Sequence, residues 1–285
     1  MVGWRMLLFV AAMITPRFLG HAVLVSGLDP RVVAWGKTAA HQWGIDTAAA
    51  RAPAEPWPME FIVPPGFGDP PGCLVREGGV ADCDVATHLG VRLTGRERTA
   101  IDCALHLPRL EAVTVLDQFL RAGLTEGRLA ARAAALRREG DRRRARSVLA
   151  LADGGAASPR ETWIRLALLD ARLPAPRTQI PVRLPGDDRT RYLDLGWEEF
   201  RLATEYDGEE HHTASADRRH DDVRRAGLRE LGWRIIPVRR DVIPARTADY
   251  IENVANALLE RGWKPSHDHL LAVMSRVRAA RRRPP

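Results

Sequence analysis

The chain has 285 residues, of which 45% are hydrophobic and 28% charged, and this balance excludes a mostly disordered protein. That length favours two compact domains over one. The longest apolar run, Met6 to Ile14, is too short to cross a membrane as a helix. Three cysteines without a C-x-x-C pair indicate neither a disulfide framework nor a zinc site, so we expect a cytoplasmic protein with no membrane partner.

The net charge of +7 is unevenly distributed along the chain. Of the 43 basic residues 41 are arginine, a bias that genome composition alone could produce. Residues 128–151 carry 8 basic and 2 acidic side chains and residues 265–285 carry 5 and 1, whereas residues 158–264 balance at 19 of each. Two basic segments beside a neutral one suggest a polyanionic partner, although solvated arginine helices would explain the charge equally well.

Residues 1–152 are expected to form a mixed, mostly helical domain with a regulatory or DNA-binding role. Its apolar start, residues 1–18, favours a buried strand or helix over a signal peptide. The proline-rich stretch 53–71 predicts loops and edge strands around the sequence MEFIVP. Apolar residues then recur at helical spacing over 91–107 and 110–123.

Local signals mark the ends of the helices in this half. Thr94, with Glu97 three residues later, forms a candidate capping box. The arginine-rich segment predicts two further helices, over 127–140 and 141–153, separated at Gly140. Three of its arginines are expected to contact nucleic acid: Arg142, Arg143 and Arg144.

The segment DGGAAS, residues 153–158, is the best linker candidate and opens a second domain over residues 153–264. Ser158, Pro159 and Glu161 are typical of a helix start. The pattern that follows predicts an α/β core in the order α-β-β-β-α-β-α. The expected elements are a helix over 158–172, strands over 177–184, 191–197 and 200–208, a helix over 217–232, a strand over 233–240 and a helix over 248–262. Residues 265–285 follow as a basic tail.

Three carboxylates are expected to meet at one end of this sheet. Alternation along a strand puts Asp194 on the face opposite to Leu193 and Leu195, while Glu205 and Asp207 share a face. If the two strands pair, the three acids converge and repel one another unless a cation neutralises them. Oxygen ligands of this kind suit Mg²⁺ or Mn²⁺, which binds a phosphate, stabilises its developing charge and activates a water.

Two adjacent histidines follow these acids. A histidine near a metal site can act as general base or as leaving-group acid, because its ordinary pKa is ~6.5. His212 is the first candidate for this role and His211 the second. Glu161 has two interpretations: it completes the metal shell, or it reaches back to the Ser158 backbone N–H as a capping residue, which the pattern S-P-R-E favours.

The motifs D-L-G-W, E-Y-D-G-E-E-H-H and L-R-E-L-G-W-R-I-I-P-V follow one another within residues 155–245. In this order they resemble the PD-(D/E)XK nuclease superfamily. More narrowly, they are similar to the very-short-patch-repair endonuclease-like branch catalogued as domain of unknown function 559. The resemblance implies a restriction-endonuclease-like core and Mg²⁺-dependent hydrolysis of DNA phosphodiesters.

The resemblance also implies roles for individual residues. Asp194 and Glu205 would hold the metal ion, and His212 would transfer protons. Arg224, on the helix that follows, would contact substrate phosphate. Its neighbour Arg225 is a further candidate for binding nucleic acid.

This sequence departs from the family pattern at one position. Asp207 stands where many members carry a lysine, and no lysine occurs between Lys37 and Lys264. Either a histidine takes the catalytic role, as in the repair branch, or the site is degenerate. In the first half, ITPRFLGHAVLVSG, AAHQWGI and LTGRERTAIDCA are similar to segments related to antitoxins of the AbiEi type, which regulate transcription.

Three hypotheses for function follow. The first is a metal-dependent DNA endonuclease, with a homodimer left open. The second is a non-catalytic DNA-binding regulator of antitoxin type that uses a degenerate nuclease fold, and the third is a protein–protein module of a defence operon. The sequence H-D-H at residues 267–269 is interpreted as a loop cluster rather than a metal site, and the isolated tryptophans as core residues.

Overall fold

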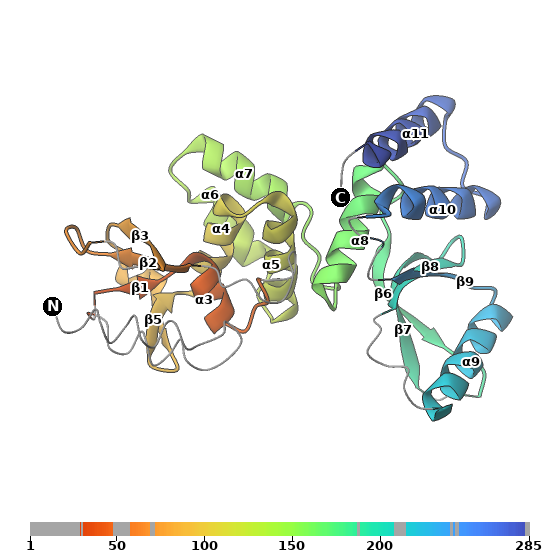
Figure 1. The fold of residues 1–285 in the computed structure, drawn as a ribbon, viewed down its shortest axis with the longest axis horizontal. Coiled ribbons are helices and arrows are strands. Elements are labelled where there is room, and N and C mark those ends of the chain that lie inside the picture. The colour runs from red at the N-terminus through yellow and green to blue at the C-terminus, as the bar shows by residue number, and fades with distance from the viewer. Residues whose placement is uncertain are drawn as a thin grey trace. The chain divides into compact units, whose positions relative to one another are not determined.

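The computed structural model describes the chain in the following ranges: residues 29, 31–47, 58–68, 72–186, 189–207, 215–239, 242 and 245–282, with the backbone alone over 215–222. Contacts divide the chain into two compact units, Met1–Gly154 and Gly155–Pro285 (Figure 1). This division falls inside the predicted linker 153–158. The apolar start at residues 1–18 lies outside the described residues. No helix among the described residues is long and apolar enough to span a membrane.

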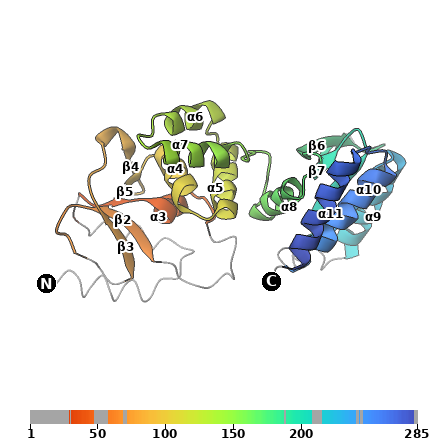
Figure 2. The same cartoon turned by 90° about the horizontal axis from the view of Figure 1, so that it is seen from above.

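The first unit combines a mixed sheet with a group of helices (Figure 2). Its strands are β1 Val33–Ala34, β2 Met59–Val63, β3 Cys73–Glu77, β4 Val85–His88 and β5 Val91–Thr94, with a 3-10 turn at Asp82–Asp84. They lie in the spatial order β3-β2-β1-β5-β4. Its helices are α3 Gly36–Gln42, α4 Arg96–His106, α5 Arg109–Arg121, α6 Glu126–Ala134 and α7 Glu139–Leu149.

Two predictions for the start of this unit are wrong because of how the sheet is paired. The segment MEFIVP supplies an inner strand rather than an edge strand, since β2 pairs with β1 on one side and with β3 on the other. Thr94 ends β5 instead of capping a helix, and its hydroxyl oxygen lies 2.7 Å from that of Thr99. Gly95 takes the N-cap position of α4 without a side-chain hydrogen bond.

The break between the two arginine-rich helices also differs from the prediction. α6 ends at Ala134 and α7 begins at Glu139, so Gly140 lies inside α7. In the connection, the Arg142 guanidinium donates to the carbonyl oxygen of Leu136 at 2.6 Å. A side-chain donor thus satisfies a carbonyl group at the end of the first helix, and the chain turns there without needing the glycine.

The second unit is an α/β structure built on a four-stranded sheet. Its elements are α8 Pro159–Asp170, β6 Arg177–Arg183, β7 Thr190–Trp197, β8 Leu202–Asp207, α9 Ser215–Glu230, β9 Arg234–Arg239, α10 Thr247–Glu260 and α11 His267–Arg281. The spatial order is β6-β7-β8-β9, antiparallel except for the parallel pair of β8 and β9, which α9 connects. The predicted order α-β-β-β-α-β-α is confirmed over residues 158–264.

α8 begins as its sequence predicts. Ser158 is the N-cap residue and accepts the Glu161 backbone N–H at 3.3 Å, with Pro159 in the first turn. The carboxylate of Glu161 reaches back, but its partners differ from the predicted Ser158 N–H. It accepts the Ala157 N–H at 2.7 Å and the Ser158 hydroxyl at 3.0 Å.

Hydrophobic clusters cover both faces of the sheet, as Figure 1 shows through the helices on either side. Residues of α8, α10 and α11 pack on one face around Leu195, whereas Leu228 of α9 packs on the other face around Leu193. The prediction that Leu193 and Leu195 share a face is therefore wrong. The alternation is interrupted beside Asp194, where Gln179 in the neighbouring strand has a φ of +48°.

The segment predicted as a basic tail is part of the second unit. α11 buries Val273 and Val277 in the cluster formed with α8 and α10. The H-D-H sequence, expected in a loop, forms the first turn of α11. The Ser266 hydroxyl accepts the His269 N–H at 3.2 Å, and a His269 ring nitrogen lies 2.6 Å from the Arg172 carbonyl oxygen.

A glycine in β7 provides a test of this sheet. Gly196 pairs with Ala203, and a Cβ at Gly196 would lie 2.5 Å from the Leu202 carbonyl oxygen and 2.9 Å from the Ala203 Cα. The Gly196→Ala substitution should therefore lower the free energy of unfolding by about 1–3 kcal/mol, because overpacking displaces the strand. Urea denaturation, with hydrogen exchange at β7 and β8, measures the effect.

Gly127→Ala is the matched control. Nothing lies within 4 Å of a Cβ at Gly127 in α6, so this substitution should be neutral or stabilise the protein by up to about 1 kcal/mol. Equal stability of the two variants would contradict the described pairing of β7 and β8.

Candidate active site

The candidate site begins where β7 and β8 run side by side. Leu195 pairs with Thr204, so the antiparallel register puts Asp194 opposite Glu205. The backbone N–H of Tyr206 donates to Asp194 Oδ2 at 2.9 Å, which holds the aspartate against β8. Two of the predicted acids are therefore neighbours because the two strands pair as expected.

α8 brings a third carboxylate to this place. Glu161 is only 5% exposed and is close enough to Asp194 to affect its ionisation. Besides its capping bonds, Glu161 Oε2 accepts a hydrogen bond from the Gln179 amide at 3.3 Å. Glu161 thus caps its own helix, as one interpretation predicted, and its carboxylate also raises the pKa of Asp194.

Gln179 is a site residue that the sequence pattern did not reveal. It lies in β6 opposite Asp194 and has a φ of +48°, which is uncommon for a residue other than glycine. Backbone strain of this kind persists where the surrounding structure holds it, often at functional sites. The strand pattern RTQIPVRL shows only a β-strand, so no local signal could have identified this residue.

The environment of Asp194 disfavours its charged form. Burial raises its pKa from 3.8 to about 7, and the nearby carboxylates of Glu161 and Glu205 contribute to the rise, against the Tyr206 N–H and Arg224, which lower it. Burial and the neighbouring carboxylates together therefore favour the protonated form of Asp194.

Arg224 of α9 supplies a cation at this site. Its guanidinium donates to Glu205 Oε2 at 2.8 Å and also contacts Oε1, forming a two-point ion pair with a carboxylate that is 16% exposed. Arg224 was predicted to contact substrate phosphate, but in this structure its side chain pairs with Glu205. Such paired geometry is typical of arginine with a carboxylate.

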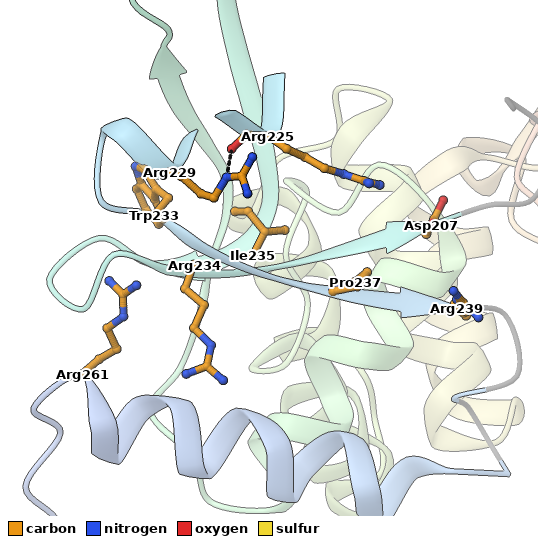
Figure 3. Close-up of a pocket in the computed structure, with 9 residues that line it drawn as sticks. All are labelled: Asp207, Arg225, Arg229, Trp233, Arg234, Ile235, Pro237, Arg239 and Arg261. Atoms are coloured by element: carbon orange, nitrogen blue, oxygen red, sulfur yellow. Dashed lines mark hydrogen bonds between the residues drawn. The ribbon is translucent and has the colours of Figure 1, made fainter. Parts of the chain in front are cut away.

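Asp207 does not join the other three acids. It shares the face of Glu205 on β8 but lies beside Arg239 of β9 in the parallel register. It lines a hollow of about 720 Å³ with Arg225 and other arginines (Figure 3). His211 and His212 lie outside the described residues, and within the described part of the chain no group of three or more His, Cys, Asp and Glu residues is arranged as a metal site.

The predicted arginines of the first unit belong to α7 and are partly used in packing. Arg142 bonds the carbonyl oxygen of Leu136, and Arg144 donates to the carbonyl oxygens of Ala104 and Leu107 at 3.2 and 2.6 Å. Arg143 is exposed. These bonds attach α7 to its neighbours, so the predicted nucleic-acid contact is left mainly to Arg143.

Two curated proteins of Mycobacterium tuberculosis are similar to this chain, one from strain CDC 1551 / Oshkosh and one from strain ATCC 25618 / H37Rv. Both are named only as uncharacterized proteins. Each is 37% identical over 155 residues, which are 53% of this chain and 56% of the relative, so the chain spans about half the length of the curated relatives it matches. No family model and no solved structure matches the chain.

The raised pKa of Asp194 predicts a pH-dependent cost to stability. The pKa of this group is 3.8 without the fold and about 7 within it, so folding takes up a proton between these values and stability falls as pH rises through them. Asp194→Asn removes the charge and keeps an oxygen for the Tyr206 N–H. At pH ~8 the free energy of unfolding of the variant should exceed that of wild type by at most ~4 kcal/mol.

Urea denaturation in the presence of EDTA measures this difference across the pH range. It should shrink as the pH falls and vanish near pH ~4, where wild-type Asp194 is protonated in the folded state. A difference that does not change with pH would show that neither burial nor the neighbouring carboxylates raise the pKa of Asp194.

Proposed function

We propose that the second unit is a metal-dependent DNA endonuclease of the PD-(D/E)XK type, which hydrolyses phosphodiester bonds. The observation that carries this proposal is that Asp194 lies opposite Glu205 in the paired strands and has a pKa raised to about 7 by burial and by the nearby carboxylates of Glu161 and Glu205. Carboxylates gathered in this way destabilise a fold, and strongly perturbed acids are typical of functional sites.

The arrangement of the second unit supports the same proposal. Its element order, α-β-β-β-α-β-α from α8 to α10, is the order predicted for the core that the resemblance implies. Glu161 comes from the first helix, Asp194 from the second strand and Glu205 from the third. Asp194 and Glu205 are the residues that the resemblance assigns to metal binding, and Glu161 is the proposed third ligand.

The three carboxylates are not arranged as a ready metal site in the described part of the chain, but the chemistry of their donor atoms suits a hard divalent cation. Glu161, Asp194 and Glu205 offer oxygen atoms only, as Mg²⁺ and Mn²⁺ prefer. The pKa of Asp194 is raised despite Arg224, chiefly by burial and also by the carboxylates of Glu161 and Glu205. When bound, the cation would stabilise the charge that develops on a scissile phosphate and lower the pKa of an attacking water.

The chain's own residues have separate tasks in this proposal. Glu161, held by the Ala157 N–H and by Gln179, presents an oriented carboxylate beside Asp194. Arg224 fixes the side chain of Glu205 through its two-point ion pair. His212 is proposed to transfer protons, with His211 as the alternative. This activity belongs in the cytoplasm, where the DNA substrate is.

A second candidate function is a DNA-binding regulator that lacks catalysis. Two observations favour it: Asp207 occupies the position where a lysine is expected, and the Glu205 carboxylate is already bound by Arg224. In this alternative the acids are remnants of an ancestral site, and the first unit, with its similarity to AbiEi-type antitoxins, would carry the regulatory role.

Cleavage of supercoiled and of mismatched DNA separates the two functions. The wild-type chain should nick or cut DNA only with Mg²⁺ or Mn²⁺. Asp194→Asn and Glu161→Gln should each lower the cleavage rate by at least ~10–100-fold, which is the loss expected when an outer-shell partner of a metal site is removed. EDTA should abolish the reaction.

Glu199→Gln is the matched control, because Glu199 is exposed in the turn between β7 and β8. It should cleave at the wild-type rate. If neither wild type nor variants cut DNA with any divalent cation, yet all shift its mobility equally, the regulator replaces the nuclease. Equal cleavage by wild type and Asp194→Asn would refute the proposed site.

A further inference from the structure

A hollow beside the candidate site is lined mainly by arginine. Its volume is about 720 Å³, and it lies along the outer strand of the sheet, between α9, β9 and the end of α10 (Figure 3). The residues that line it are Asp207, Arg225, Arg229, Trp233, Arg234, Ile235, Pro237, Arg239 and Arg261. Five of these nine residues are arginines, and one is acidic.

Within the described part of the chain, three of these arginines form no ion pair. Arg225, Arg229 and Arg239 are exposed and form no salt bridge with a described residue; Arg229 donates only to the Arg225 carbonyl oxygen of its own helix, at 3.3 Å. By contrast, Arg234 pairs with Glu260, and Arg261 donates to the Gly232 carbonyl oxygen at 2.7 Å. Among the described residues, the positive charge of the hollow is therefore only partly balanced, which favours an anionic ligand.

The position of the hollow links it to the three carboxylates. Asp207 follows Glu205 by two residues on the same face of β8, and Arg225 follows Arg224, the partner of Glu205. In Figure 3 the Arg225 side chain extends along β8 towards Asp207. A phosphate chain whose scissile bond lies at the carboxylates would reach the hollow with its next phosphates.

The size of the hollow favours one strand over a duplex. Pockets of ~300–1,000 Å³ hold a single small ligand, so this volume suits about one or two nucleotides. Trp233 is 3% exposed and lies under the Arg201 guanidinium, 5.5 Å from the ring centroid. It is thus not open to a stacking base, and binding would depend on phosphates rather than on base identity.

We infer that this arginine-lined hollow binds the phosphate backbone of a single DNA strand that continues from the candidate site. The inference rests on the proposed function and deepens it, because it selects substrates with an unpaired strand beside the cut. It predicts binding that is independent of sequence, weakens steeply with salt, and does not need a divalent cation.

Fluorescence anisotropy of the full chain tests this in EDTA, with a labelled oligodeoxythymidylate of about twelve nucleotides and a duplex of equal length. The double variant Arg229→Gln with Arg239→Gln should bind the single strand at least about tenfold more weakly. The slope of log affinity against log salt should become shallower by ~0.7 for each phosphate that the variant no longer binds.

Arg92→Gln with Arg183→Gln is the matched control, since both arginines are exposed on strands outside the hollow and the change in charge is the same. It should bind the single strand as wild type does, and circular dichroism should show that both double variants fold. Equal weakening by the two double variants, or tighter binding of duplex than of single strand by wild type, overturns the inference.

Failure of the nuclease proposal gives a different result. Binding is measured without metal, so it does not depend on cleavage. If the protein never cuts DNA but the Arg229→Gln with Arg239→Gln variant binds the single strand weakly, the nuclease proposal fails and the strand-binding site stands. If the protein cuts duplex DNA with Mg²⁺ and the same double variant binds and cuts normally, the nuclease proposal stands and the strand-binding site is refuted.

Discussion

The antiparallel register of β7 on β8 is the constraint on which the candidate site depends. It sets Asp194 opposite Glu205 and brings the Tyr206 N–H within 2.9 Å of the aspartate. A shift of one residue would turn Asp194 away from Glu205 and move buried leucines to the other face. The hydrophobic clusters on both faces of the sheet therefore also determine the positions of the acids.

The second unit separates negative and positive charge over a short length of chain. Burial and the carboxylates of Glu161 and Glu205 raise the pKa of Asp194, while Arg225 and Arg229 of α9 and Arg239 of β9 form no salt bridge with a described residue. An acidic site alone would repel a polyanion such as DNA, and the arginine-lined hollow alone would bind DNA without cleaving it. The proposed division assigns chemistry to the carboxylates and strand binding to the arginines.

Local sequence signals predicted the second unit well because they depend on neighbouring residues. Ser158 and Pro159 start α8 as expected, and alternating apolar residues mark the strands. The same reasoning failed where distant contacts decide. Thr94 ends a strand because β5 pairs with β1 and β4, and Gly140 sits inside a helix because Arg142 satisfies the turn before it.

The carboxylates themselves could be named from the sequence, since strand order and spacing put Asp194 and Glu205 near one another. Gln179, the pairing of Glu205 with Arg224, and the separation of Asp207 from the other acids could not. Each depends on side chains from different elements that meet only after folding.

The basic excess was visible in the composition, yet the hollow that collects Arg225, Arg229 and Arg239 arises only when α9 packs beside an exposed outer strand. The sequence determined which chemical groups are present and the elements that carry them, because hydrogen bonding and side-chain periodicity act locally. Tertiary structure alone decided which of those groups interact electrostatically, because that interaction depends on distance in space.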